Sequence, residues 1–205
     1  MRLVVDWDGT ITVQDSLVEV IHEFGDPAIL AELEPRVGLD LTLHEEIAAE
    51  FAAITAPLET VVAWVLENVE VRPGLAELAE LEPLVISAGF HELIEPVLRR
   101  EGIELDVLAN RVEARPDGWV VHWRDEAVCE SCGEPCKRGG LAGEPYVYLG
   151  DGYSDRCAAL AADRVFARDS LATYLGSKGV AYESFDDLRD VADRLTSQSA
   201  DVIPD

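Results

Sequence analysis

The sequence is short of positive charge and has no long apolar run. Among its 205 residues, 16 are Lys or Arg and 41 are Asp or Glu, so the formal charge is −25. A chain this acidic repels phosphate backbones and anionic lipids, and we therefore expect neither nucleic acid nor membrane surfaces as partners. No stretch of about eighteen apolar residues occurs, and the N-terminus lacks the basic and apolar regions of a signal peptide. These absences predict a cytoplasmic protein.

Lysine is the scarcest charged residue of the chain. Only Lys137 and Lys178 occur, beside 14 arginines. A lysine that persists in such a sequence suits a position where a compact ammonium with three donors works better than a planar guanidinium. Lys137 is therefore a candidate functional cation, and the alternative is an exposed cation on a loop.

Short apolar runs alternate with helical patterns over most of the chain. The runs cover residues 2–5, 83–86, 105–109, 146–149 and 164–167. A strand buried in a parallel sheet is apolar along its whole length, so these runs predict strands. Their alternation with helices predicts an α/β fold, with a Rossmann-like parallel-sheet core and helices on both faces. Residues 112–123, with Pro-Asp-Gly in the middle, predict a small β-hairpin.

A long helical segment interrupts this alternation. Residues 12–72 contain three apolar stripes at helical spacing, separated by glycine and proline. We expect an α-helical cap at 12–72, inserted after the first strand, and a core domain made of residues 1–11 and 73–205. The cap segment has 13 Asp and Glu against only Arg36 and Arg72, a local charge of 2 − 13 = −11.

Acidic side chains follow two of the predicted strands. Asp6 and Asp8 come directly after the first strand, and Asp151 and Asp155 follow the fourth. Because ligands of open α/β sheets bind at the carboxyl ends of the strands, these four carboxylates should meet there and repel one another. Magnesium prefers oxygen ligands, so the sequence predicts a Mg²⁺ site. Residues 87–90 add a hydroxyl and a glycine before a helix, whose N-terminus can bind phosphate.

The ordered set of motifs resembles the haloacid dehalogenase superfamily of phosphohydrolases. Residues 6–10 (DWDGT) match its first motif, residues 87–90 (SAGF) its second and residues 150–155 (GDGYSD) its fourth, with Lys137 as the candidate for the third. The helical insertion resembles the cap of the phosphoserine-phosphatase-like branch. Within that branch, residues 165–169 and the cysteine-rich run before Lys137 resemble the methionine-salvage phosphatase group most.

The resemblance implies a Mg²⁺-dependent phosphomonoesterase that hydrolyses a small phosphorylated metabolite through an aspartyl phosphate. Asp6 would be the nucleophile, Asp8 the general acid and base, and Lys137 the cation that neutralises the phosphoryl group. The implied metal-binding residues are Asp6, Asp8 through its main-chain carbonyl, Asp151, and Asp155 as a ligand or an orienting residue. The implied phosphate-binding residues are Trp7, Ser87, Ala88, Gly89 and Lys137.

Two other functions stay open, namely a phosphotransferase or mutase of the same fold and a non-catalytic module that binds a phosphorylated ligand. The site also departs from the family pattern, because the glycine-rich segment 139–143 leaves little room for a helix between Lys137 and Asp151. We therefore expect Lys137 on a loop. The acidic cap predicts a neutral or cationic leaving group and makes phosphoserine a poorer substrate.

A cysteine cluster directly precedes the candidate lysine. Cys129, Cys132 and Cys136 form a C-x2-C-x3-C run. They could bind a structural Zn²⁺ together with a fourth ligand, either His122 or Cys157. A redox-labile disulfide and free thiols are the alternatives, although a cytoplasmic location disfavours stable disulfides. Any constraint on this run should help to position Lys137.

Overall fold

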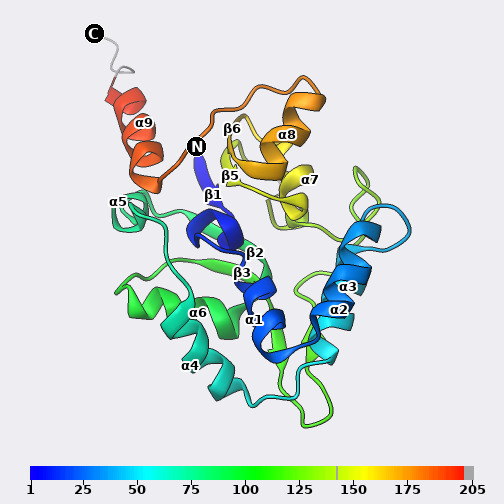
Figure 1. Cartoon of the computed structure of the whole chain (residues 1–205). Coiled ribbons are helices and arrows are strands. Elements are labelled where there is room, and N and C mark those ends of the chain that lie inside the picture. Colours follow the sequence, from blue (N-terminus) through cyan, green and yellow to red (C-terminus); the bar gives the residue numbers. More distant parts are fainter. Residues whose placement is uncertain (142, 201–205) are drawn as a thin grey trace.

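A single six-stranded sheet organises the chain. The computed structural model describes residues 1–141 and 143–200, so residue 142 of the glycine-rich segment and residues 201–205 of the predicted core domain lie outside the described residues. The strand order is β4-β3-β2-β1-β5-β6 (Figure 1). The strands are β1 (Arg2–Val5), β2 (Leu84–Phe90), β3 (Val107–Glu113), β4 (Val120–His122), β5 (Tyr146–Gly150) and β6 (Arg164–Ala167).

Helices cover both faces of this sheet. Val5 of β1 belongs to a hydrophobic cluster that includes α5 (Leu75–Ala79), α6 (His91–Arg100) and α9 (Leu188–Ala200). The neighbouring Val4 points to the opposite face and joins a second cluster, which contains α7 (Arg156–Ala159) and α8 (Asp169–Ser177). Adjacent side chains of a strand point to opposite faces, so a continuous apolar run is what a doubly covered strand requires. The predicted fold class is confirmed.

Two strands differ from their expected extents by more than one residue. β2 continues to Phe90, where the prediction ended it at residue 86, because Asn110 of β3 pairs with Phe90 and its side-chain amide donates to the Ala88 carbonyl at 2.7 Å. β3 is longer than predicted and also pairs antiparallel with β4, with Arg111 opposite His122. The predicted hairpin therefore exists, and it shares β3 with the parallel sheet.

The segment between β1 and α5 is helical, as predicted. Its helices are α1 (Ser16–Phe24), α2 (Pro27–Leu33), α3 (Leu43–Ala52) and α4 (Leu58–Asn68), with a 3-10 turn at Glu34–Arg36. Asp15 begins α1 by accepting hydrogen bonds from the Leu17 and Val18 N–H groups at 3.0 and 3.1 Å. A capping box of Thr42 and Glu45 begins α3. No helix in the described part of the chain is long and apolar enough to cross a membrane.

The helical segment packs directly on the core. Its two ends lie together, because Thr12 and Val71 form an antiparallel bridge. Phe51 of α3 packs edge-on against Phe90 of β2, with ring centroids 4.7 Å apart, and the indole N–H of Trp119 donates to the Ala56 carbonyl at 2.8 Å. Helices and sheet therefore share one hydrophobic cluster. The domain boundaries at residues 12 and 72 stay a prediction.

Candidate active site

The first motif forms a tight turn at the carboxyl end of β1. The N–H of Asp6 donates to the Leu149 carbonyl at 3.0 Å, and the Asp6 side chain is 4% exposed. Residues 7–11 then form one wide helical turn in which Gly9 has φ +70°. A Cβ on Gly9 would collide with the carboxylate of Asp151. Glycine is therefore required both for this backbone conformation and for the close approach of the two motifs.

Three carboxylates converge at this edge. Oxygens of Asp6, Asp151 and Asp155 lie within 4.8 Å of one another. Burial, and then repulsion by Asp155, raises the pKa of Asp151 to about 6, and the same two causes raise that of Asp6 well above its ordinary value. A dense set of carboxylate oxygens that repel one another fits a hard dication such as Mg²⁺. The side chain of Asp8 does not belong to this group.

Asp155 is held by four donors. One carboxylate oxygen accepts from Lys137 Nζ at 2.6 Å and from the Tyr148 hydroxyl at 2.7 Å. The other accepts from the N–H groups of Asp151 and Gly152, each at 2.9 Å. Both oxygens are thus engaged, which suits an orienting residue more than a direct ligand. Tyr148 was missed from the sequence, where it is one more residue of an apolar strand.

Lys137 is buried between two of the carboxylates. Its side chain is 4% exposed, and Nζ donates to both Asp6 and Asp155. Burial alone would lower the pKa of Lys137, but the charges of Asp155 and Asp6 outweigh burial and raise it. The residue begins a 3-10 helix, Lys137–Leu141, so the expected loop is a short helical turn. The alternative of an exposed cation is wrong.

Asp8 has a different environment from Asp6. One oxygen accepts from the N–H of Ser16 at 3.0 Å and also from the Ser16 hydroxyl, while the other accepts from the Ser87 hydroxyl at 3.4 Å. Burial, and next the charge of Asp15, raise the pKa of Asp8 to about 7. The hydrogen bonds from Ser16 lower the pKa but do not outweigh these two causes. A carboxyl group with this pKa can give and take a proton near neutral pH. Ser16 was missed from the sequence, where only its place at a helix start marks it.

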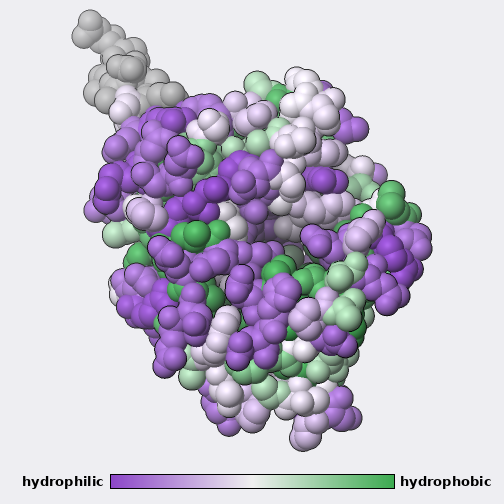
Figure 2. Space-filling model, in the orientation of Figure 1, coloured by the Kyte–Doolittle hydropathy of each residue, from purple (hydrophilic) through white to green (hydrophobic). Residues whose placement is uncertain are grey.

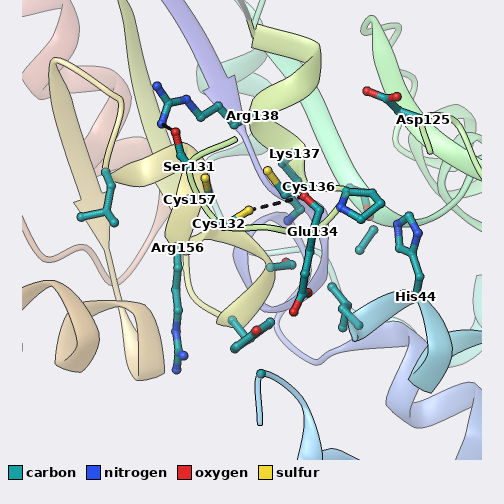
Figure 3. Close-up of a pocket in the computed structure, with 18 of the residues that line it drawn as sticks. His44, Asp125, Ser131, Cys132, Glu134, Cys136, Lys137, Arg138, Arg156 and Cys157 are labelled. Atoms are coloured by element: carbon teal, nitrogen blue, oxygen red, sulfur yellow. Dashed lines mark hydrogen bonds between the residues drawn. The ribbon is translucent and has the colours of Figure 1, made fainter. Parts of the chain in front are cut away.

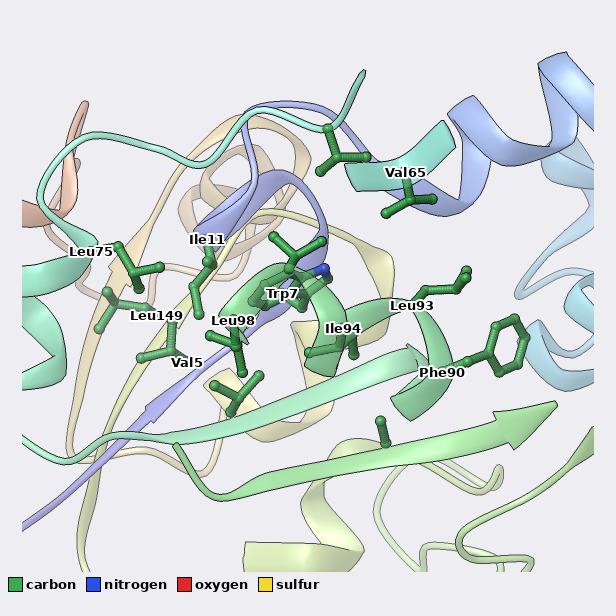
Figure 4. Packing of buried hydrophobic residues seen from close by; sticks show 14 of the residues in the cluster. Val5, Trp7, Ile11, Val65, Leu75, Phe90, Leu93, Ile94, Leu98 and Leu149 are labelled. Carbon is green, nitrogen blue, oxygen red and sulfur yellow. The ribbon is translucent and has the colours of Figure 1, made fainter. Parts of the chain in front are cut away.

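The second motif lies beside Asp8. The N–H of Gly89 donates to the Ser87 hydroxyl at 2.8 Å. A Cβ on Gly89 would lie 3.1 Å from that hydroxyl oxygen and 3.2 Å from Asp8, so a larger residue would crowd the site. The side chain of Trp7, by contrast, is 1% exposed and packs in the core near Ile11 (Figure 4). Only the main chain of Trp7 is therefore available to a phosphate.

Two adjoining cavities open between the core and the cap helices. One has a volume of about 500 Å³ and is lined by Asp6, Asp8 and Asp151 together with cap residues. The other, about 380 Å³, is lined by Ser87, Lys137 and the cysteine-rich segment (Figure 3). Ala88 lines both. The predicted nucleophile and proton carrier thus line one cavity, while Ser87 and Lys137 line the neighbouring one.

The fold brings a fourth cysteine to the predicted cluster. Sulfurs of Cys129, Cys132, Cys136 and Cys157 lie within 4.8 Å of one another, and none is in a disulfide. Figure 3 shows Cys132, Cys136 and Cys157 close to Lys137. His122, the other predicted fourth ligand, instead lies 3.3 Å from a carboxylate oxygen of Glu113.

The chain belongs to the haloacid dehalogenase-like hydrolase family, because residues 3–160 match that family. It is also similar to the 2-hydroxy-3-keto-5-methylthiopentenyl-1-phosphate phosphatases of Bacillus cereus (strain B4264) and Bacillus thuringiensis (strain Al Hakam). Each is 25% identical over 210 residues, with 95% of both chains covered. The resemblance to this superfamily inferred from the motifs is confirmed.

Solved structures show the same fold. A phosphoserine phosphatase from T. onnurineus, in complex with NDSB-201, superimposes with a TM-score of 0.68 at 20% identity, covering 94% of this chain and 92% of that one. A phospho-aspartyl intermediate analogue of phosphoserine phosphatase gives the same score and identity and covers 94% and 97%. The similarity extends over the helical segment as well as the sheet.

Proposed function

We propose that this protein is a Mg²⁺-dependent phosphomonoesterase that hydrolyses a small phosphorylated metabolite through an aspartyl phosphate on Asp6. The observation that carries the proposal is the pair of carboxyl groups Asp6 and Asp8 at one sheet edge in contrasting environments. Asp6 is held by a buried ammonium, as a nucleophile requires, whereas Asp8 is held by hydroxyl and N–H donors and has a pKa near neutrality.

Each residue has a defined step in this proposal. A carboxylate oxygen of Asp6 attacks phosphorus, the bond to the alcohol breaks, and the leaving alkoxide takes the proton of Asp8. Asp8 then accepts a proton from the attacking water, and cleavage of the phosphorus–oxygen bond restores the Asp6 carboxylate. Lys137 and the hydroxyl of Ser87 bind phosphoryl oxygens, and the cap helices exclude bulk water from the acyl phosphate.

The metal ligands we propose are Asp6, Asp151 and the main-chain carbonyl of Asp8. Asp155 acts beside them by holding Lys137 and the turn after β5. When bound, Mg²⁺ supplies the positive charge that offsets carboxylate repulsion and polarises the phosphoryl group.

Hydrolysis of p-nitrophenyl phosphate tests this function. Mg²⁺ should support turnover, EDTA should abolish it, and Asp6→Asn should lower kcat at least about a thousandfold with an unchanged circular dichroism spectrum. Asp151→Ala should raise the Mg²⁺ requirement more than Ser87→Ala does. Transfer of the phosphoryl group to added alcohols in preference to water would favour the phosphotransferase or mutase. Binding of phosphate esters without turnover would favour the non-catalytic module.

We also propose that the four cysteines bind a structural Zn²⁺. The segment around the first two closes on itself, since the Gly133 N–H donates to the Cys129 carbonyl at 2.8 Å and the Cys129 N–H donates to the Glu134 carbonyl at 3.0 Å. Gly133 has φ +81°, which lets the chain reverse there. Cys157 reaches the same point from α7, with its sulfur 3.8 Å from that of Cys129. Four sulfurs gathered from two segments suit a closed tetrahedral zinc site.

Such an ion would support the active site from outside it. Cys136 directly precedes Lys137, and Cys157 lies two residues after Asp155. Zinc would therefore tie the segment that carries the lysine to the helix that follows its carboxylate partner. This tie would add to the short 3-10 helix, Lys137–Leu141, in holding the lysine in place.

Metal analysis of protein expressed with added zinc tests the site. The wild type should hold about one equivalent, Cys157→Ser should lose most of it, and Ser131→Ala in the same segment should retain it. Cys157→Ser should lower kcat for p-nitrophenyl phosphate more than it raises KM. Less than about a tenth of an equivalent in the wild type contradicts the proposal.

A further inference from the structure

The larger cavity carries an excess of negative charge on its cap side. Its cap lining includes Asp15, Glu34, Glu46 and Glu50. Among the described residues that line it, Arg156 is the one basic side chain, and its guanidinium is stacked 4.6 Å from the ring centroids of Tyr153 and Tyr174 on the core side. The cap wall therefore presents carboxylates without a matching cation.

The two cap arginines do not face this cavity. Arg36 pairs with Asp40 at 3.1 Å, and its side chain is 42% exposed. Arg72 is buried and donates to the main-chain carbonyls of Gly9 and Thr10 at 2.8 and 2.9 Å. Neither can hold a second anionic group of a substrate.

Among the acidic cap residues of the cavity, Glu50 gives the clearest indication of a ligand. Its side chain is 4% exposed, and its Oε1 atom is buried without a hydrogen-bond partner. Glu46 lies one turn earlier on the same helix and is 7% exposed. Two like charges at this spacing destabilise a helix, and an unpaired buried carboxylate costs more. Packing alone does not explain why either glutamate is buried. A bound cation would compensate the charges of both carboxylates.

We infer that this acidic recess binds a positively charged group on the leaving alcohol, so that the substrate is the phosphate ester of an amino alcohol. This inference rests on the proposed phosphomonoesterase function and assigns its substrate class. The same cavity is lined by Val18, Ile21 and Ile47. Apolar walls beside carboxylates match an ammonium carried on methylene groups, whereas a second metal ion would need oxygen ligands or water on all sides.

The electrostatics of the recess agree with this assignment. Burial first, and the neighbouring carboxylates second, raise the pKa of Glu46 to about 7 and that of Glu50 to about 8. A cation bound beside them would lower both pKa values and favour the charged carboxylates. A substrate that adds a carboxylate, such as phosphoserine, meets the four acidic side chains of the cap wall here and should be used less efficiently.

A matched substrate series tests the inference. We would compare ω-aminoalkyl phosphates of two, three and four methylenes with n-alkyl phosphates of the same length, and use p-nitrophenyl phosphate as the reference. At one length at least, the amino ester should exceed its alkyl partner about tenfold or more in kcat/KM. Glu50→Gln should reduce this ratio about tenfold, while Glu67→Gln, an exposed cap residue outside the cavity lining, should leave it unchanged.

The outcomes separate the two proposals. Turnover of p-nitrophenyl phosphate without preference for amino esters overturns the cation site and leaves the phosphatase intact, whereas no turnover of any ester with Mg²⁺ overturns the phosphatase itself. If Glu50→Gln misfolds by circular dichroism, Glu46→Gln serves instead, and an unchanged preference in the folded variant overturns the inference. An amino-ester preference that disappears when Mg²⁺ rises from about 1 to about 10 mM assigns the recess to a metal ion and also overturns it.

Discussion

At the scale of single residues, the site depends on one buried cation among several buried acids. Lys137 contacts Asp6 and Asp155 in a space that leaves its side chain 4% exposed. The partners lie 131 and 18 positions away in sequence. A compact ammonium can donate to both carboxylates and still turn a third proton toward a phosphoryl oxygen, whereas a guanidinium is larger and its donors are fixed in a plane.

This geometry predicts that Lys137→Arg is not a conservative change. We expect kcat for p-nitrophenyl phosphate to fall about a hundredfold or more, because the wider guanidinium displaces Asp6 from its position. Lys178→Arg is the matched control, since Lys178 is exposed at the end of α8 and should tolerate the change. Near-wild-type activity of Lys137→Arg would show that the site needs only a positive charge.

Glu50 predicts a pH-dependent effect on stability. Its pKa is about 8 in the folded protein and about 4.5 in the unfolded chain, so its contribution to stability is present below pH 4.5 and lost as the pH rises through 8. Glu50→Gln should therefore raise the Tm more at about pH 9 than at about pH 5, by a difference on the order of 1 kcal/mol, or about 2–4 °C. Thermal unfolding of Glu67→Gln at both pH values gives the control. An equal shift at both pH values would contradict the raised pKa.

At the scale of elements, Arg72 joins the turn at Trp7–Ile11 to the cap and to the C-terminal helix. Its guanidinium donates to the carbonyls of Gly9, Thr10 and Thr12, and to that of Asp186 at 3.2 Å, just before α9. Two segments far apart in the sequence, residues 9–12 and Asp186, are thus hydrogen-bonded to one side chain. The first motif is therefore fixed at two places. Arg72 binds its main-chain carbonyls, and its Asp6 belongs to the carboxylate cluster.

Replacement of this arginine should uncouple the elements. Arg72→Lys keeps the charge but cannot reach all the carbonyls, so we expect a loss of about 2–3 kcal/mol in the free energy of unfolding, measured in urea. Arg36→Lys alters an exposed pair on the cap and should change stability by less than about 0.5 kcal/mol. Equal effects of the two variants would contradict a joining role for Arg72.

At the scale of the whole molecule, the formal charge of −25 opposes compactness. Hydrophilic side chains dominate the face seen in Figure 2. Repulsion among exposed charges is screened by salt, while the buried carboxylates at the sheet edge are screened much less. Monovalent salt and Mg²⁺ should therefore stabilise the protein through different residues.

Thermal unfolding can separate these two effects. An increase from about 0.02 to about 0.5 M NaCl should raise the Tm by several degrees, and KCl should act equally. Millimolar Mg²⁺ should add a further increase that Asp151→Ala removes, while the NaCl effect in this variant stays unchanged. A Tm insensitive to NaCl would show that the surface charges are too well separated to matter.

The sequence by itself determined the fold class and singled out the candidate site residues. Apolar runs and helical stripes record which faces are buried, and the order of the motifs, with the scarcity of lysine, was enough to select Asp6, Asp8, Lys137 and Asp151. The cysteine run was visible too, but the choice between His122 and Cys157 was not. Periodicity specifies a local face and carries no information about which distant segment covers it.

Only the tertiary structure decided the contacts across the fold. It placed Tyr148 on Asp155 and Ser16 on Asp8, brought Cys157 to the cysteine run, and turned Glu46 and Glu50 of a charged helix inward. On the sequence these glutamates look the same as Glu45, which is exposed and caps the helix. The free energy of a carboxylate depends on burial and on its neighbours, and both are set only when the cap helix packs against the core.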